Sequence, residues 1–192
     1  MIRREPSRIP QTRWQSPRQA GQTTPTPLPW AVLLTNGELL GGYFTTPPSL
    51  DGAVLVSLHL DRDGPTLTSR FRPAGLPDRP DEAWVAAGCD GFELQVRFLD
   101  VADVRVAGWP FGTPVSVEIS RREPAHLRRI AVSAIGGDGQ VLEFTSNASL
   151  TVGHLAATRS RDDTYWHVGR VDQIRLGDSL PDTTDHAYWG RL

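Results

Sequence analysis

The stretch FELQVRF, residues 92–98, has the clearest strand pattern in the chain. Apolar and polar residues alternate strictly along it, with the apolar ones at positions 92, 94, 96 and 98. Successive side chains of a β-strand point to opposite faces, so this alternation predicts a strand with one buried face and one solvent face. We expect Phe98 to point into the core and Glu93 to lie on the solvent side.

Weaker strand patterns lie on both sides of this stretch. Residues 54–61 alternate, and the turn sequence DRDGP leads into a second strand that contains Leu67 and Phe71, which predicts a β-hairpin. Further strands are expected over residues 101–106, 115–120, 130–134, 142–144, 150–158 and 171–176, with GGDG as the turn at 136–139. Short strands separated by Gly, Pro and Asp turns predict a mostly β fold, an antiparallel sandwich or curled sheet.

The rest of the chain divides around this β region. Residues 1–29 are rich in Arg, Pro, Gln and Thr and have almost no apolar pattern, which predicts a disordered tail. Asn36 is expected to cap one short N-terminal helix that ends before Pro47, and residues 73–91 are expected to form a long loop holding Trp84. We therefore expect a tail over 1–29, a β domain over 30–158 and a C-terminal extension over 159–192.

Charge and composition narrow the function classes. All 20 basic residues are Arg, and residues 30–192 carry 15 Arg against 21 Asp and Glu, a formal charge of −6. An acidic body disfavours nucleic-acid binding and favours a basic partner. The run at residues 30–34 is about the longest apolar run and is far short of the roughly 20 residues that span a bilayer, and the basic start lacks the apolar segment of a secretory signal. We expect a cytoplasmic protein without a membrane partner.

Catalytic and metal-binding signals are weak. The five His residues are never paired at metal-ligand spacing, the one Cys cannot supply a thiolate cluster, and no G-x-S-x-G or phosphate-binding loop occurs. Asp61–Gly64 has the start of a calcium loop, but position twelve of that loop is Arg72 where Glu is needed, so a hairpin turn is the better interpretation. We expect no enzyme, no metal and no cofactor.

Acidic and aromatic residues gather at two places and are our candidates for a partner-binding surface. The alternatives are a solvated acidic rim and, for tryptophan, a place in the core. The first group comes just before a tryptophan and the second lies between two expected strands: Asp78, Asp81, Glu82 and Trp84, then Asp100, Asp103 and Trp109.

The order of short motifs along the chain resembles the Immunity protein 50 family. A short helix with Leu-Leu and Tyr-Phe is followed by Pro48-Ser49-Leu50, a strand, Asp63-Gly64-Pro65, a second strand and a Pro-rich loop that ends in Trp84. The strand FELQVRFLDV, Gly108-Trp109 and three more strands with Phe144 near the end complete the similarity, which covers about residues 30–158.

This resemblance implies a protein encoded beside a bacterial polymorphic toxin, which protects the producing cell by binding the cognate toxin domain. It implies no catalysis and carries over no contact residues. The leading hypothesis is therefore neutralisation of a toxin by occlusion. A β domain that binds a small molecule or carbohydrate through exposed Trp is the alternative, and a hydrolase comes third. A neighbouring toxin gene would favour the first hypothesis, and a sugar-uptake operon the second.

Overall fold

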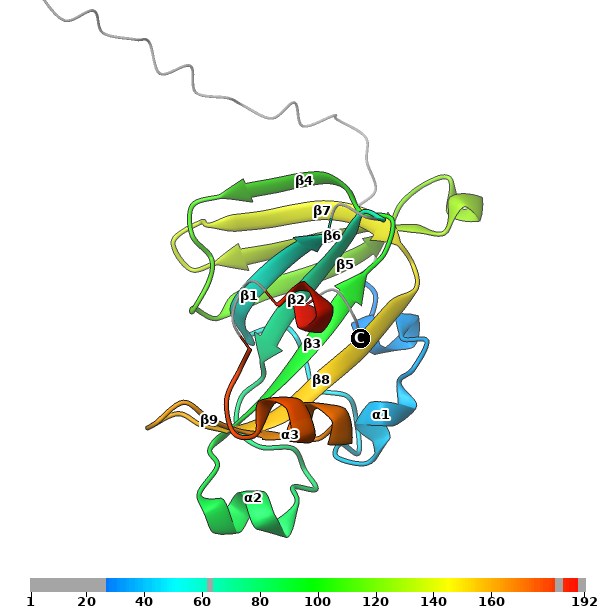
Figure 1. Cartoon of the computed structure of the whole chain (residues 1–192). Helices are drawn as coiled ribbons and strands as arrows, with labels where there is room; N and C mark the ends of the chain where they lie inside the picture. The colour runs from blue at the N-terminus through cyan, green and yellow to red at the C-terminus, as the bar shows by residue number, and fades with distance from the viewer. Residues whose placement is uncertain (1–26, 62–63, 182–184, 190–192) are drawn as a thin grey trace, which may run out of the picture.

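The computed structural model describes residues 27–61, 64–181 and 185–189, which form two antiparallel sheets. The five-stranded sheet has the order β1 (Val54–Asp61), β2 (Thr66–Arg72), β3 (Gly91–Phe98), β8 (Leu150–Arg159) and β9 (Thr164–His167). The four-stranded sheet has the order β4 (Ala102–Ala107), β7 (Val141–Asn147), β6 (Arg129–Gly136) and β5 (Val115–Arg121). Figure 1 shows the four-stranded sheet at the top and the five-stranded sheet running down from it. The mostly β, antiparallel prediction is confirmed.

The core lies between the sheets and is built on β3. Phe92, Leu94, Val96 and Phe98 are all buried on its inner face, as their alternation predicts. Phe98 meets Phe144 of β7 edge to face, with ring centroids 4.8 Å apart, and so joins the two sheets. Such aromatic pairs add stabilisation beyond the area they bury.

Short helices connect and cover the sheets. They are the 3₁₀ turns η1 (Trp30–Leu33) and η2 (Ala125–Leu127) and the α-helices α1 (Glu38–Gly41), α2 (Glu82–Ala87), α3 (Arg170–Leu176) and α4 (His186–Trp189). Two expectations are wrong here. Residues 73–91 are not all loop, because they contain α2, and residues 171–176 form a helix where a strand was expected.

The predicted capping role of Asn36 is also wrong. The residue before α1 is Gly37, and no side chain caps the helix. The amide of Asn36 instead donates to the carbonyl oxygen of Val152 at 2.7 Å and accepts from the Val152 N–H at 2.9 Å. A side chain with one donor and one acceptor group can replace a backbone neighbour in this way, so Asn36 ties the N-terminal segment to β8.

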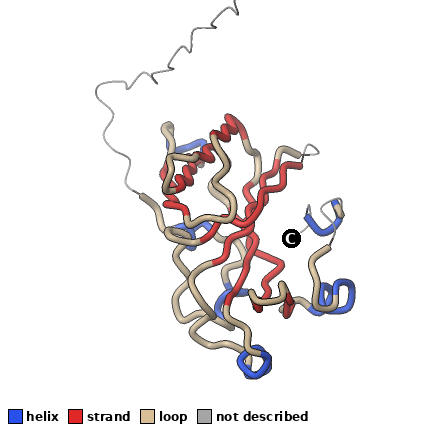
Figure 2. The backbone as a smooth tube through the Cα atoms, turned by 90° about the vertical axis from the view of Figure 1, so that its left-hand side faces the viewer, coloured by secondary structure: helices blue, strands red, loops and turns tan. Residues whose placement is uncertain are grey.

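The second face of β3 is buried as well, contrary to expectation. Glu93 is 2% exposed and Gln95 is fully buried. The C-terminal helices lie over this outer face of the five-stranded sheet, on the right in Figure 2. There Asp172 of α3 contacts His154 of β8, with 2.7 Å between Oδ2 and Nδ1. The cover comes from a segment about 80 residues further along the chain, which the local alternation cannot reveal.

Candidate functional site

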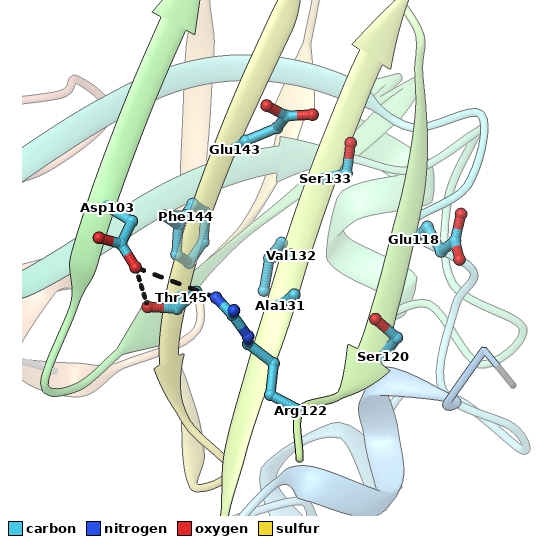
Figure 3. Close-up of a pocket in the computed structure, with 10 residues that line it drawn as sticks. All are labelled: Asp103, Glu118, Ser120, Arg122, Ala131, Val132, Ser133, Glu143, Phe144 and Thr145. Carbon is cyan, nitrogen blue, oxygen red and sulfur yellow. Dashed lines mark hydrogen bonds and ion pairs between the residues drawn. The ribbon is translucent and has the colours of Figure 1, made fainter. Parts of the chain in front are cut away.

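The outer face of the four-stranded sheet is open and hollowed. Because β5, β6 and β7 alternate, every second side chain of these strands points away from the core. Figure 3 shows these side chains around a shallow pocket of about 330 Å³. The polar residues of its lining come from all four strands and from the residue after β5: Asp103, Glu118, Ser120, Arg122, Ser133, Glu143 and Thr145.

Asp103 reaches this pocket because β4 is irregular. The register with β7 shifts between Ala102 and Arg105, and Asp103 has a φ of 56°. A bulge of this kind redirects a side chain. The Asp103 carboxylate accepts a hydrogen bond from the Thr145 hydroxyl at 3.4 Å and lies 4.0 Å from the Arg122 guanidinium, as the dashed lines in Figure 3 mark.

A second hollow of about 230 Å³ continues the first, since both are lined by Asp103, Arg122 and Thr145. It extends to Arg129, which forms an ion pair with Asp100 and donates to the Thr145 hydroxyl at 3.1 Å. We call the two hollows together the outer groove. Its lining includes the carboxylates of Asp103, Glu118, Glu123 and Glu143 against the guanidinium groups of Arg122 and Arg129, so its formal charge is negative.

The edge of β4 adjoins this groove and differs from the other sheet edges. Segments of the chain itself bond to β1, β5 and β9, through Leu55 N–H to Thr113 at 3.3 Å, Leu28 N–H to Ile119 at 2.7 Å and Tyr165 N–H to Asp178 at 2.9 Å. Within the described part of the chain, no backbone hydrogen bond joins the far edge of β4 to another segment. Val104 and Val106 on this strand are 40% and 45% exposed. An exposed edge with apolar side chains is a place where another chain can pair.

The structure brings together only some of the predicted partner-binding residues. Asp100 and Asp103 both lie at the outer groove. Trp109 follows β4, is 73% exposed and stacks edge to face on Phe111 with centroids 4.8 Å apart. The remaining four residues belong to α2 and the loop before it, at the opposite end of the molecule in Figure 1.

The residues around α2 have structural contacts. Asp78 accepts from the Thr45 N–H at 2.8 Å, and Asp81 caps α2 by accepting from the Ala83 N–H at 2.8 Å. Trp84 is 5% exposed and stacks on Tyr43 with centroids 5.1 Å apart. Glu82 is exposed in the first helical turn. Whether these residues contact a partner stays a prediction, but a buried Trp84 could affect binding only through the packing of its surroundings.

Several groove residues were not among the candidates. Glu118, Ser133 and Glu143 occupy every second position of strands that the sequence does predict. The alternation of polar with apolar residues along these strands is the sequence signal that could have identified them. What it could not supply was the spatial order β4-β7-β6-β5, which sets Asp103 beside Thr145.

Other kinds of site have little support in the described residues. No cluster of three or more His, Cys, Asp or Glu side chains there is arranged to hold a metal ion. Burial raises the pKa of Cys89, which makes its thiol less reactive at neutral pH. None of the described helices is long and apolar enough to cross a membrane.

The fold, a two-sheet antiparallel β domain with an open, charged outer face on the four-stranded sheet, does not by itself give a function. The family is more specific. A model of the Immunity protein 50 family matches residues 36–148, more than half of the chain, and the protein belongs to this family. The match spans β1 to β7 and therefore includes the whole outer groove. No curated protein and no solved structure matches the chain.

Proposed function

We propose that this protein binds the domain of a cognate bacterial polymorphic toxin inside the producing cell and neutralises it by occluding the toxin's active surface. Membership in an immunity-protein family is the observation that carries this proposal. Occlusion needs an interface on the order of 800 Å² on each partner. A broad open sheet face meets that need better than a closed pocket.

The outer groove and the adjoining edge of β4 are the surface we assign to the toxin. The groove supplies charge, through four carboxylates against two guanidinium groups. The edge supplies backbone donors and acceptors next to exposed Val104 and Val106. Trp109, exposed in the loop after β4, is the large aromatic side chain that could serve as an anchor. This surface favours a basic toxin domain.

Association kinetics with the toxin domain encoded by the adjacent gene test this proposal. Charges at the rim of an interface act mainly on the association rate, and the effect weakens with salt. Glu118→Arg in the groove should slow association by about tenfold at low salt. Trp109→Ala should leave association nearly unchanged and speed dissociation.

Glu82→Arg on α2 is the matched control, because Glu82 is also exposed but lies at the other end of the molecule. If Glu82→Arg slows association and Glu118→Arg does not, the toxin binds near α2, where the first group of predicted acidic residues lies. Lack of binding at micromolar concentrations, with both proteins folded, would refute the immunity function itself.

A further inference from the structure

The edge of β4 that faces away from β7 is covered at its start and open along the rest. One residue before the strand, the Val101 N–H donates to the carbonyl oxygen of Pro65 at 2.7 Å, so the chain itself covers this edge up to Val101. Residues 102–106 are all exposed. Figure 1 shows β4 as the outermost strand of its sheet, at the top. The open part of the edge is therefore β4 itself.

Hydrogen bonds at the end of β7 show which of its backbone groups face β4. The Asn147 N–H donates toward β4, to the Leu99 carbonyl oxygen at 3.0 Å, and the Ala148 N–H donates toward β6, to the Arg128 carbonyl oxygen at 2.7 Å. The backbone groups of successive strand residues point to opposite sides. Because β7 pairs with β6 without a register shift, its odd-numbered residues face β4 throughout.

The same register gives the backbone groups of β4 that face away from β7. Arg105 and Ala107 are opposite odd-numbered residues of β7 and face them. Val106 lies between the two, so its N–H and C=O face away. The Val104 carbonyl also faces away, because it shares a planar trans peptide unit with the Arg105 N–H. Within the described residues, none of these three outward groups has a hydrogen-bond partner.

The side chains of β4 are divided between the two faces of the sheet. Arg105 lies on the side of the outer groove, where it donates to Glu143 at 2.9 Å. Val106 is opposite the buried Leu142 and lies on the core side. Val104 shares that side with Val106, yet the two valines are 40% and 45% exposed. The apolar layer between the sheets is therefore left open along this edge.

We infer that the toxin adds one of its own β-strands to β4, as a fifth strand of the four-stranded sheet. This inference rests on the proposed function and specifies how the toxin binds. The outward groups of Val104 and Val106 are an acceptor, a donor and an acceptor, the order that an extended backbone complements. The added strand would alternate, with apolar side chains beside the two valines and polar side chains beside the groove.

A second copy of this chain fits the edge less well than a toxin strand does. An antiparallel pair of β4 strands that sets Val104 opposite Val106 of the second copy also sets the two Arg105 side chains directly opposite each other. Like charges at directly opposite positions of a sheet are unfavourable. A toxin strand has no such constraint, because its sequence differs from that of β4.

Proline at position 106 tests the inference, since it removes an outward N–H and no hydrogen bond to β7. We expect Val106→Pro to weaken binding of the toxin domain encoded by the adjacent gene by at least about tenfold, measured by titration calorimetry. Val106→Thr is the matched control. It has nearly the same shape and keeps the N–H, and should bind within about threefold of the wild type.

Amide hydrogen exchange, followed residue by residue by NMR, gives a readout that needs no variant. In the free protein the Val106 amide should exchange fast, whereas the Arg105 amide, which faces β7, should already be protected. Saturation with the toxin domain should slow exchange at Val106 by at least about tenfold. If Val106→Pro fails to fold in thermal melts, this measurement decides.

The outcomes separate this inference from the proposed function. Wild-type affinity in folded Val106→Pro, equal weakening by Val106→Thr, or unchanged exchange at Val106 in the complex would overturn strand addition while toxin binding stands. No binding by the wild type would refute the immunity function, and strand addition with it. Sedimentation of the free protein checks the other occupant. If Val106→Pro breaks a dimer and leaves toxin affinity unchanged, the edge pairs with a second copy and the inference is wrong.

Discussion

Phe98 shows how one side chain joins the two sheets. It is 1% exposed and meets Phe144 of the opposite sheet edge to face. Phe98→Ala would remove this contact and leave a cavity that the surrounding strands can fill only in part. We expect a loss of about 3 to 5 kcal/mol in the free energy of unfolding, measured by urea denaturation. A loss below about 1 kcal/mol would mean that the sheets are not joined at this point.

Glu93, five residues earlier on the same strand, should be nearly as costly to replace. Its carboxylate is buried and faces Arg70 and Arg72. Glu93→Ala would leave two guanidinium groups without their counter-ion, and breaking a buried ion pair from one side costs about 3 to 5 kcal/mol. The same urea series tests this. A cost well under 1 kcal/mol, as for an ordinary surface position, would show that water reaches the cluster.

Phe98 and Glu93 together show which features of β3 the sequence could predict and which it could not. Alternation placed Phe98 on the core side, which needs only the period of a strand. The same alternation placed Glu93 in solvent, and that was wrong. A local pattern gives the two faces of a strand, but what covers each face depends on segments that come from elsewhere in the chain.

Asp90, just before β3, should make stability depend on pH. Its carboxylate accepts from the backbone N–H of Ser160 at 2.9 Å and from the Ser160 hydroxyl at 3.0 Å, and these hydrogen bonds lower its pKa below the ordinary value of 3.8. A carboxylate with a lowered pKa in the folded state stabilises the fold above its unfolded-state pKa. That contribution is lost as the pH falls through the folded-state pKa.

Thermal melts of wild type and Asp90→Asn should therefore differ at pH 7. The difference should shrink as the pH falls below about 4. A difference that stays constant from pH 7 down to about pH 2.5 would mean that the Asp90 charge does not stabilise the fold.

Among the elements, α2 is so short that its stability depends on the residues at its two ends. It has six residues, and Asp81 caps its start while Gly88 ends it with a φ of 74°. Asp81→Ala should cost about 1 kcal/mol, because the Ala83 N–H would lose its acceptor, whereas Glu82→Ala should cost a few tenths at most. Equal costs in urea denaturation would contradict the capping role. The same reasoning makes Glu82, and not Asp81, the position for a charge reversal near α2.

The wrong prediction of a strand over residues 171–176 has a physical reason. The β-branched residues Val171 and Ile174 favoured a strand over residues 171–176, yet both are exposed on the helix α3. The helix turns Asp172 toward His154 of β8, a contact between positions 18 residues apart. Intrinsic strand propensity predicts secondary structure poorly where such a tertiary contact determines the local conformation. The eight longer strands were easier to predict, because alternation and turn signals mark them in the local sequence.

At the scale of the whole molecule, irregular segments outside the named strands form backbone hydrogen bonds with the edges of the sheets. Residues 112–114 pair with β1, Asp178 bonds to β9, and Pro27 and Leu28 run beside β5. The sequence indicated a mostly β, antiparallel fold, either a sandwich or a curled sheet, but it could not indicate these edge contacts, because irregular segments have no periodic pattern. The candidate interface follows from them, since β4 is the edge where the described residues show no such pairing.

The pairing beside β5 leads to the last prediction, which concerns where the N-terminal segment can be cut. Leu28 donates to Ile119 at 2.7 Å, and Pro27 forms a bridge with Ser120. Leu28 and Pro29 also line a small hollow with Trp30 and Val117.

Deleting residues 1–26, which have almost no apolar pattern in the sequence, should therefore leave the melting temperature unchanged. Deleting residues 1–29 removes a sheet hydrogen bond and its packing, about 1 kcal/mol, and should lower the melting temperature by about 2 to 4 °C. If the two truncations melt together, the contact beside β5 contributes nothing to stability. If deletion of 1–26 alone lowers the melting temperature by as much, the folded domain begins earlier in the chain than residue 27.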